Sequence, residues 1–398
     1  MAIVLAFSGG LDTSFCVPYL KETYNEPVYT VTVNTGGLTH EDEVLLDQRA
    51  LELGAEQHFT IDGRSDLFWN HLSFLIKGNV LRGNVYPLSV GPERVTQAQH
   101  IVKAARDLGV RAIAHGSTGA GNDQVRFDVA LRILASEMEI ITPIRTLGYS
   151  RPQTAAYLNE KGFDVPAKTT TYSINRGLWG TTIGGRETLG TIDPLPDEAY
   201  PDTVSAFKCP DTPLTLKLTF EKGVPTAIDG SMMDPVLLIE RLNELGGDHG
   251  VGRDIHIGDT ILGIKGRIGF EAPAAIILIK AHQELEKIVL TKWQRYQKDQ
   301  LSKFYGMLLH EGQHFDPVMR DIEAFLNSSQ DVVTGSVTIR LYKGHLSVQG
   351  CESPHSLFDL SVASYGETNT LWDARDASGF TQIYGVPSFL ANKKRDSH

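Results

Sequence analysis

The stretch IVLAFSGGLDTS, residues 3–14, runs from an apolar segment directly into a loop of small and polar residues. Residues 3–7 have the composition of a buried strand, and Gly9 and Gly10 allow the backbone to turn sharply after it. A helical pattern begins at once, so the N–H groups of the turn and the positive end of the helix dipole would meet. The stretch therefore predicts a strand, a turn that holds phosphate or pyrophosphate, and a helix.

The polar side chains of this first loop add detail to that prediction. The hydroxyls of Ser8, Thr13 and Ser14 supply further donors, whereas Asp12 would repel a bare phosphate. We therefore expect a divalent cation between the carboxylate and the phosphate. The loop is not a Walker A motif, because no Gly-Lys-Ser/Thr ends it. The alternative interpretation is a plain glycine turn whose Asp or Thr caps the helix.

Outward from the first loop, short apolar runs alternate with helical patterns. The runs cover residues 3–7, 28–33, 57–61, 112–115 and 140–143, and the helical patterns cover 13–22, 43–53, 66–76 and 96–108. This alternation predicts a parallel sheet with helices on both faces, and ligands of such sheets bind at the carboxyl ends of the strands. Pro18 lies too deep in the first helix for the N1 position and is expected to kink it.

The second half of the chain predicts a mixed α+β domain. Residues 162–213 are rich in Gly, Pro, Thr and Asp, so we expect a long ordered connection that lines a cleft. The expected elements beyond it are a strand at 214–221, helices at 235–245 and 273–309 (the latter broken), and a hairpin of 332–341 with 345–350. The expected domains are 1–164, 165–370 and a short C-terminal tail at 371–398. We expect Glu284 and Glu286 on a solvated helix face.

Composition narrows the class of protein. The 398 residues include 37 Lys and Arg against 48 Asp and Glu, a net charge of −11, with 41% hydrophobic residues. This balance is typical of a globular protein and argues against a nucleic-acid or anionic-membrane partner. The three cysteines are too few and too widely spaced for a disulfide framework, and no apolar run is long enough for a membrane span. We expect a cytoplasmic protein.

A second loop, residues 115–128, follows the apolar run that ends at His115. It carries three glycines and then a cluster of polar residues, and its glycine spacing is not that of a nicotinamide-binding fingerprint. Asp123 could pair with the ammonium of an amino acid, and Arg126 or backbone N–H groups with its carboxylate. The alternative is a helix start capped by Asn122 or Asp123. His115 is about as easily a structural histidine as an acid–base residue.

The two loops together resemble the argininosuccinate synthase family, within the ATP pyrophosphatase group of adenine-nucleotide hydrolase-like (HUP) folds. Further matching segments lie at residues 86–88, 172–174 with 178–180, 220–225, 249–253, 263–267 with Glu271, and 352–354. The resemblance spans about residues 3 to 380. It implies an α/β HUP domain, a second synthetase domain, and ATP-dependent condensation of citrulline with aspartate through citrullyl-AMP, with Mg²⁺. It also implies a homotetramer with a C-terminal arm, and the short chain after Gly379 suggests that the arm is reduced.

The resemblance implies roles for individual residues. Those implied to bind ATP are Ala6, Phe7, Ser8, Gly9, Gly10, Leu11, Asp12, Thr13, Ser14, Val33 and Gly116. Those implied to bind aspartate are Thr118, Asn122, Asp123 and Arg94. Those implied to bind citrulline are Tyr86, Asn122, Arg126, Ser173, Thr182, Asp259 and Phe270. Asp12 and Asp123 are the implied catalytic residues, and the groups that hold the metal are left open.

The sequence also departs from the family pattern, mostly in the citrulline half. The segment before Arg94 is Val-Gly-Pro-Glu, residues 90–93, and other unusual residues are Ala120, Asn175, Gly177, Gly258 and Phe270. Gly258 replaces a glutamate of the pocket, and we expect Asp259 to supply the missing charge so that free citrulline remains the substrate. The alternatives are a ligase for a modified citrulline such as an N-acyl form, an RNA-thiolating or amidotransferase-type ATP pyrophosphatase, and a non-catalytic sensor.

Overall fold

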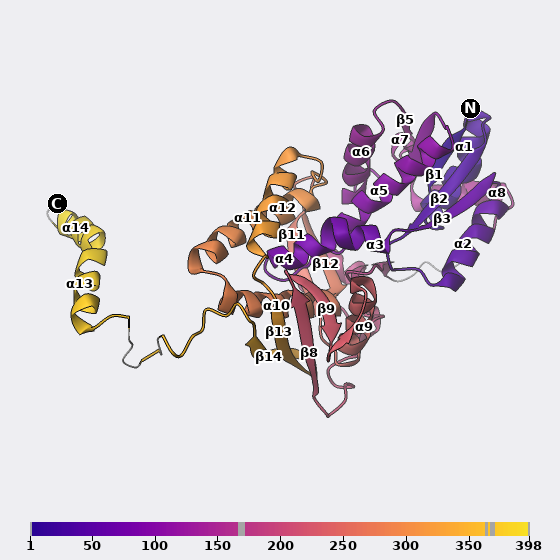
Figure 1. Ribbon diagram of the computed structural model, residues 1–398. Coiled ribbons are helices and arrows are strands. Elements are labelled where there is room, and N and C mark those ends of the chain that lie inside the picture. The colour runs from indigo at the N-terminus through magenta and orange to yellow at the C-terminus, as the bar shows by residue number, and fades with distance from the viewer. Residues whose placement is uncertain (1, 166–171, 363–364, 367–370, 397–398) are drawn as a thin grey trace.

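The computed structural model describes residues 2–165, 172–362, 365–366 and 371–396. Figure 1 shows two packed domains and, beyond them, a C-terminal segment that extends away from both. The first domain contains the N-terminus and a parallel sheet, and the second contains two antiparallel sheets and four long helices. Among the helices of these residues, none is both long and apolar enough to cross a bilayer.

The first sheet is the predicted parallel sheet. Its strands are β1 (Ile3–Ala6), β2 (Val28–Asn34), β3 (Gln57–Asp62), β4 (Ala112–His115) and β5 (Glu139–Ile141). They lie in the order β3-β2-β1-β4-β5, and every pairing is parallel. The predicted boundaries are correct to within one or two residues, and the largest error is at Pro143, which begins a helix instead of ending β5.

Helices cover both faces of this sheet, as expected. On one face lie α1 (Leu11–Tyr24), α2 (His40–Glu52), α7 (Pro143–Leu147) and α8 (Arg151–Glu160), and on the other α5 (Val90–Asp107) and α6 (Asn122–Leu134). Pro18 does not end α1, which continues to Tyr24. Crossover helices on both faces leave the carboxyl ends of β1 and β4 open side by side, where a ligand can reach them.

The helix expected at 66–76 is three shorter pieces, and it packs in the second domain. The pieces are α3 (Arg64–Leu67), the π-helical turn η1 (Phe68–Leu72) and α4 (Ser73–Gly78). Their apolar side chains join the core of the second domain, although the chain then returns to the first domain through α5. Residues 64–95 therefore run from the first domain into the core of the second domain and back again.

The second domain is built on the expected strand and hairpin. A five-stranded antiparallel sheet contains β10 (Ser231–Met232), β9 (Val224–Ile228), β8 (Leu214–Glu221), β13 (Gly335–Tyr342) and β14 (His345–Glu352), in that order. The helices are α9 (Pro235–Asp248), α10 (Pro273–Val289), α11 (Lys292–His310) and α12 (Pro317–Ser329). The break expected in the helix at 273–309 falls between α10 and α11.

The connection expected at 162–213 contains regular structure that its composition did not predict. Its strands β6 (Ser173–Asn175) and β7 (Thr181–Gly184) join β11 (Arg253–Asp259) and β12 (Lys265–Glu271) in a sheet ordered β11-β12-β7-β6. Residues 166–171 of this connection lie outside the described residues. Both strands are short: β6 pairs with its neighbour β7, and β7 also pairs with β12, which is far away in the chain. Local composition therefore carries little trace of them.

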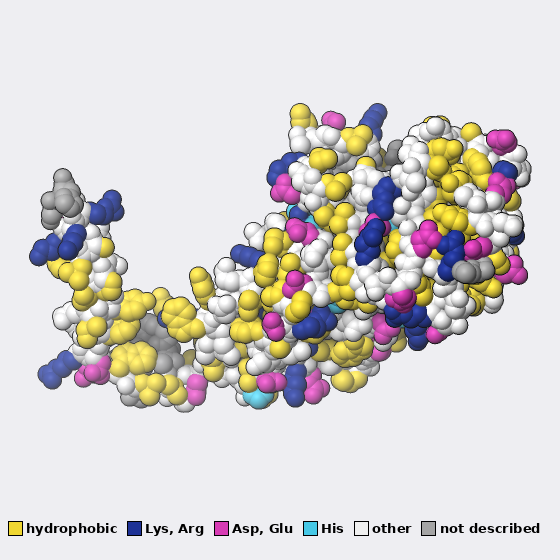
Figure 2. Space-filling view, turned by 90° about the horizontal axis from the view of Figure 1, so that it is seen from above, with side chains coloured by type: hydrophobic (Ala, Val, Ile, Leu, Met, Phe, Trp, Pro, Cys, Tyr) yellow, Lys and Arg dark blue, Asp and Glu magenta, His cyan; other side chains and the backbone are white. Residues whose placement is uncertain are grey.

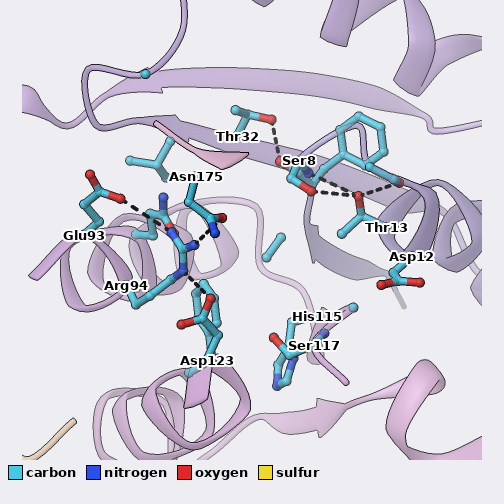
Figure 3. A pocket seen from close by; sticks show the side chains of 18 of the residues that line it. Ser8, Asp12, Thr13, Thr32, Glu93, Arg94, His115, Ser117, Asp123 and Asn175 are labelled. Carbon is cyan, nitrogen blue, oxygen red and sulfur yellow. Dashed lines mark hydrogen bonds and ion pairs between the residues drawn. The ribbon is translucent and has the colours of Figure 1, made fainter. Parts of the chain in front are cut away.

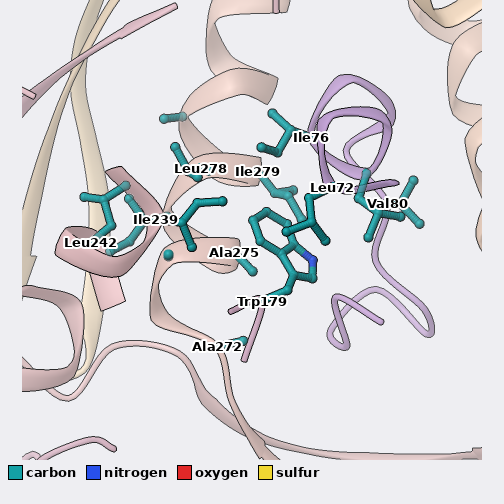
Figure 4. Packing of buried hydrophobic residues seen from close by; sticks show 14 of the residues in the cluster. Leu72, Ile76, Val80, Trp179, Ile239, Leu242, Ala272, Ala275, Leu278 and Ile279 are labelled. Carbon is teal, nitrogen blue, oxygen red and sulfur yellow. The ribbon is translucent and has the colours of Figure 1, made fainter. Parts of the chain in front are cut away.

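Trp179 lies at the centre of the second core (Figure 4). Its side chain is fully buried among Leu72, Ile76, Ile239 and Ala275, and its indole N–H donates to the carbonyl of Pro87 at 2.9 Å. This bond ties the segment that leads into α5 to the second domain. The tryptophan therefore determines where the first residues of α5 stand relative to the first loop.

The expectation of a solvated face at Glu284 and Glu286 is wrong for Glu286. This side chain is 2% exposed, lies 3.0 Å from the buried ammonium of Lys298, and accepts hydrogen bonds from Asn79 and Gln330. A buried charge needs such partners, and all of them come from other elements. Glu284 is partly exposed and pairs with Lys280 and Lys287, as a surface residue does.

The predicted tail contains two helices, α13 (Ala374–Tyr384) and α14 (Val386–Arg395). Figure 1 places them apart from both domains, and Figure 2 shows hydrophobic side chains over their surface. Phe380, Ile383, Tyr384, Phe389 and Leu390 are each more than half exposed. The segment is thus a helical arm with apolar faces that the other residues described in the structure do not cover.

Candidate active site

A cavity of about 600 Å³ opens at the carboxyl ends of β1, β2 and β4. The first loop lines one side, α5 and β6 with the residue after it line the opposite side, and the end of β4 lines the floor (Figure 3). Twelve of the predicted residues are in this lining: Ala6, Phe7, Ser8, Gly10, Leu11, Asp12, Thr13, Val33, Arg94, Gly116, Asp123 and Ser173. Tertiary structure thus joins the two loops and the 162–213 connection.

The first loop has the geometry of an anion site. Gly9 has φ +69°, a left-handed conformation that favours glycine. The N-cap of α1 is Gly10, and no side chain caps it, so the first N–H groups of the helix are left for a ligand. Thr13 is held in place, since its Oγ1 accepts from the N–H of Ser8 (3.3 Å) and donates to the carbonyl of Gly10 (3.2 Å).

The second loop packs tightly against the first. A Cβ on Gly116 would lie 3.0 Å from Cγ2 of Thr13, so glycine permits this close approach. Behind the loops, the hydroxyl of Thr32 in β2 donates to the carbonyl of Phe7 at 2.7 Å. Ser14, which does not line the cavity, donates to the carbonyl of Gly9 at 3.3 Å. These contacts hold the phosphate loop against its neighbours before any ligand binds.

Asp12 is the residue of this loop that fits a metal ion. Burial raises the pKa of its carboxyl, and the positive charge of Arg151 opposes this rise only in part. Nowhere in the described ranges do three or more His, Cys, Asp or Glu side chains gather into a metal site. A single carboxylate beside a phosphate site is the donor set that Mg²⁺ uses when the phosphates and water complete its shell. Arg151, a lining residue, was missed in the sequence analysis.

His115 has a structural environment. Its ring is 1% exposed, and its Nδ1 accepts from the N–H of Ser117 at 3.3 Å. The proton is therefore on Nε2, which donates to Asp128 at 2.9 Å. Asp128 in turn accepts from Arg145 at 2.8 Å. The histidine holds the end of β4 in place, and the structural interpretation is the better one.

On the opposite side of the cavity, Asp123 bridges Arg94 and Arg126, and Figure 3 shows its contact with Arg94. Arg94 Nε donates to one carboxylate oxygen and Arg126 donates to the other, both at 2.9 Å. Burial would raise the pKa of Asp123, but these positive charges outweigh it and hold the pKa below its usual value. Asp123 is therefore an ionised anchor that orients both guanidinium groups.

The residues predicted for citrulline form a second group next to this bridge. Tyr86 is buried and packs on Phe270, with ring centroids 5.3 Å apart, and Phe270 lies opposite Thr182 in the pairing of β12 with β7. His256, which the sequence analysis did not single out, stacks on the same tyrosine at 5.6 Å. Asn122 accepts from the N–H of Ile261 at 2.9 Å and so holds the turn between β11 and β12.

Among the residues predicted for the two amino acids, Tyr86, Asn122, Arg126, Thr182 and Phe270 lie outside the cavity lining, and so do Thr118 and Asp259. Thr118 is exposed at the rim of the second loop, outside the cavity lining. Asp259 is exposed at the end of β11, where its carboxylate pairs with Lys265 at 2.6 Å. Side chains alternate along a strand, so Asp259 points to the face opposite that of His256 and Gly258. The structure does not bring this carboxylate toward Tyr86.

Sequence reasoning also missed part of the far wall. Glu93, Gln97, Asn175 and Arg176 line the cavity around Arg94. Two of these, Glu93 and Asn175, had been noted only as departures from the family pattern. The sequence did contain one sign of Glu93, because this residue is charged whereas the residues just before it, 90–92, are apolar or small.

The parallel sheet, the phosphate loop at its carboxyl edge and the second domain beside the cavity define an ATP-using enzyme of the HUP class. A family model described as the arginosuccinate synthase N-terminal HUP domain matches residues 2–164, and its C-terminal domain counterpart matches residues 172–391. The chain is 41% identical over 396 residues to an argininosuccinate synthase of Xanthomonas campestris pv. campestris, covering 98% of this chain and 97% of that one. It is 39% identical over 392 residues to that of Pyrococcus furiosus, covering 98% and 94%. The chain belongs to the argininosuccinate synthase family, which confirms the resemblance seen in its motifs.

Proposed function

We propose that this chain ligates citrulline and aspartate at the expense of ATP, releasing AMP and pyrophosphate. The observation that carries the proposal is the cavity itself. The phosphate loop of β1 and α1 faces Arg94 and Asp123 across one continuous space, and Arg126 holds the second oxygen of Asp123 from outside the lining. This common space would allow ATP and the amino acids to meet. Family membership supports the same reaction, because the relatives are named argininosuccinate synthases.

The first chemical step is attack of the ureido oxygen of citrulline on the α-phosphorus of ATP. The P–O bond to pyrophosphate breaks, and the N–H groups at the start of α1, with the hydroxyls of Ser8 and Thr13, hold the departing anion. Mg²⁺, held by Asp12 and the phosphates, would neutralise part of that charge. The aspartate amine then attacks the activated carbon, and the C–O bond to AMP breaks.

The remaining assignments follow the two sides of the cavity. For aspartate we propose Arg94, Asp123 and Asn122, with Thr118 at the rim. For citrulline we propose Arg126, Asn122, Ser173, Tyr86, Thr182 and Phe270. The support is that Arg94 and Arg126 share one carboxylate, so the two amino acids would be held next to each other. Free citrulline is the proposed substrate.

We also propose that the protein is a cytoplasmic homotetramer. Exposed apolar faces on α13 and α14 support association, since a second copy of the chain would bury them. All three cysteines are free, which suits a reducing compartment.

The test of the ligase proposal uses purified protein and separates the two steps. Exchange of labelled pyrophosphate into ATP that depends on citrulline reports the first step, and argininosuccinate formation with all three substrates reports the second. We expect both. Citrulline-independent exchange, or turnover only with an N-acyl citrulline, would contradict the proposal.

A further inference from the structure

Glu93 is a buried carboxyl group in the cavity wall that the proposed reaction has not yet used. Its side chain is 3% exposed and lies in the first turn of α5, next to Arg94. Its Oε2 is 3.7 Å from Arg94, whereas its Oε1 is buried and has no hydrogen-bond partner among the described residues. A buried carboxyl oxygen without a hydrogen-bond partner lowers the stability of the fold, which indicates that the group serves a function.

The surrounding backbone is shaped to admit this carboxyl. Gly177, in the turn after β6, lies directly against it, and a Cβ on Gly177 would overlap Oε1. Gly177 does not have a positive φ, so backbone conformation does not require glycine here. Glu93 and Gly177 are 84 positions apart in the chain and pack directly against each other in the fold. Glu93 fills the space that a side chain at position 177 would take.

The charges around Glu93 determine what it can bind. The titratable groups that face it are Arg94 on its own helix, Asp123 on α6, and Tyr86. Asp123 has each oxygen occupied by an arginine. When Glu93 is neutral, the formal charges of Arg94, Arg126 and Asp123 add up to +1, and this net positive charge repels an ammonium ion. When Glu93 is ionised, the net charge of the four groups is zero.

We propose that Glu93 receives the ammonium group of the acceptor amino acid and accepts the proton that this nitrogen must lose before it attacks. The inference rests on the ligase function proposed above. It assigns a catalytic residue for the second chemical step, on the side of the cavity where Arg94 would hold the carboxylates of the same amino acid.

The proton transfer balances as follows. One N–H bond of the ammonium breaks, its electron pair stays on nitrogen, and an O–H bond forms on Glu93. The free amine then forms a C–N bond to the adenylated carbon, the C–O bond to AMP breaks with its electron pair on the phosphate oxygen, and the second proton leaves on the AMP phosphate.

Burial raises the pKa of Glu93 to about 8. The negative charge of nearby Asp123 also raises this pKa, whereas the positive charge of Arg94 lowers it. A carboxyl with this pKa is largely protonated at pH 7 until an ammonium ion approaches, whose positive charge favours the ionised form, and its pKa is then suited to proton exchange with an amine.

The test compares wild type with Glu93→Gln, which keeps the shape of the side chain and removes its basic oxygen. Citrulline-dependent pyrophosphate exchange should stay within about twofold, because the first step does not involve the amine. Argininosuccinate formation at pH 7.5 should fall by roughly 100-fold, a typical loss for a missing general base. In the variant, kcat/KM for aspartate should keep rising about tenfold per pH unit up to about pH 9, because only the free amine reacts and the ammonium of a free amino acid stays largely protonated over that range.

Hydroxylamine provides a rescue that a purely structural role would not show. It is an unprotonated nucleophile at pH 7.5, so it should trap the adenylate at similar rates in wild type and Glu93→Gln. Gly177→Ala provides a second variant, since it displaces the Glu93 carboxyl and keeps its charge; it should slow the aspartate step and spare exchange. Gly190→Ala is the matched control, because a Cβ there meets nothing within 4 Å.

The outcomes separate this inference from the ligase proposal. Wild type without citrulline-dependent exchange would overturn the proposed function. Wild type with both activities, and Glu93→Gln with an unchanged aspartate step and pH profile, would overturn the role of Glu93 alone. A variant that loses exchange and aspartate use equally would also contradict it, since the carboxyl would then act on the whole site.

Discussion

His256 fills the space beside Gly258: a Cβ on this glycine would lie 2.6 Å from Nε2 of the imidazole. The same ring stacks on Tyr86. Burial lowers the pKa of His256, and the charge of Arg82 lowers it further, so the ring is neutral at pH 7. The surroundings of Tyr86 are therefore neutral and aromatic, where the sequence analysis expected Asp259 to supply a negative charge.

This arrangement predicts opposite results for two neighbouring residues of β11. Asp259→Asn should leave the KM for citrulline within about twofold, because its carboxylate is in an exposed ion pair with Lys265, and such pairs contribute little. His256→Ala should raise the KM for citrulline several-fold by removing the ring that supports Tyr86. Steady-state kinetics at varied citrulline measure both. A large effect of Asp259→Asn would restore the compensation that the sequence suggested.

Asp12→Asn should abolish pyrophosphate release and leave the fold intact. The amide keeps the shape of the carboxylate but loses the charge that would hold Mg²⁺ at the phosphates. We expect a loss of at least 100-fold, roughly what removal of one preorganised charge-stabilising group costs. Pyrophosphate exchange and a thermal melt together measure this. Undiminished turnover would mean that Asp12 only serves the start of α1.

Asp123→Asn should weaken aspartate use more than citrulline adenylation. Arg126 keeps a second anchor, because its Nε donates to the carbonyl of His310 at 2.9 Å. Arg94 keeps only longer contacts, to Gln97 at 3.2 Å and Asn175 at 3.4 Å. Loss of the charge-assisted bonds should cost roughly 1.5–3 kcal/mol, about 10- to 150-fold in kcat/KM for aspartate. Equal losses in exchange and in the full reaction would refute this division of the site.

Acid should destabilise the protein partly through His314. Burial and the nearby charge of Arg320 lower its pKa to about 3, so the folded state holds this ring neutral. Because the unfolded ring binds a proton near pH 6.5, its contribution to stability is complete above that pH and is lost as pH falls toward 3, by up to about 1.4 kcal/mol per pH unit. Urea unfolding of wild type and His314→Gln between pH 7 and 5 should show a shallower pH dependence in the variant. Parallel curves would contradict this assignment.

The C-terminal arm should be needed for assembly but not for the fold of the two domains. Phe389→Asp places a charge on an exposed apolar face of α14. We expect light scattering to show a tetramer for the wild type and a smaller species for the variant, with the same far-UV spectrum. Ser388→Asp, next to it in the helix, adds the same charge at a polar position and controls for charge alone. A variant that remains tetrameric would exclude this face from the interface.

The features that the sequence determined are local or periodic. The strand and glycine loop at residues 3–14 contain their own signals, because a buried strand, a left-handed glycine and a helix start each depend on adjacent residues. The alternation of strands and helices likewise predicted the parallel sheet, and the motif residues predicted the family. The short strands β6 and β7 carried no such signal, because β7 is stabilised by pairing with the distant β12 and β6 by pairing with β7.

Only the tertiary structure decided which environment each side chain has. Glu286 was expected on a solvated helix face and Glu93 was noted only as a departure from the family pattern, yet one is buried against Lys298 and the other against Gly177. Asp123 was predicted to meet a substrate ammonium, and folding instead places it between Arg94 and Arg126. The ionisation of a carboxyl depends on the charges and solvent within a few ångströms of it, and here those neighbours come from distant parts of the chain. Sequence therefore identified the reaction that this fold supports, and the packing of the two domains determined the surroundings of each carboxyl group.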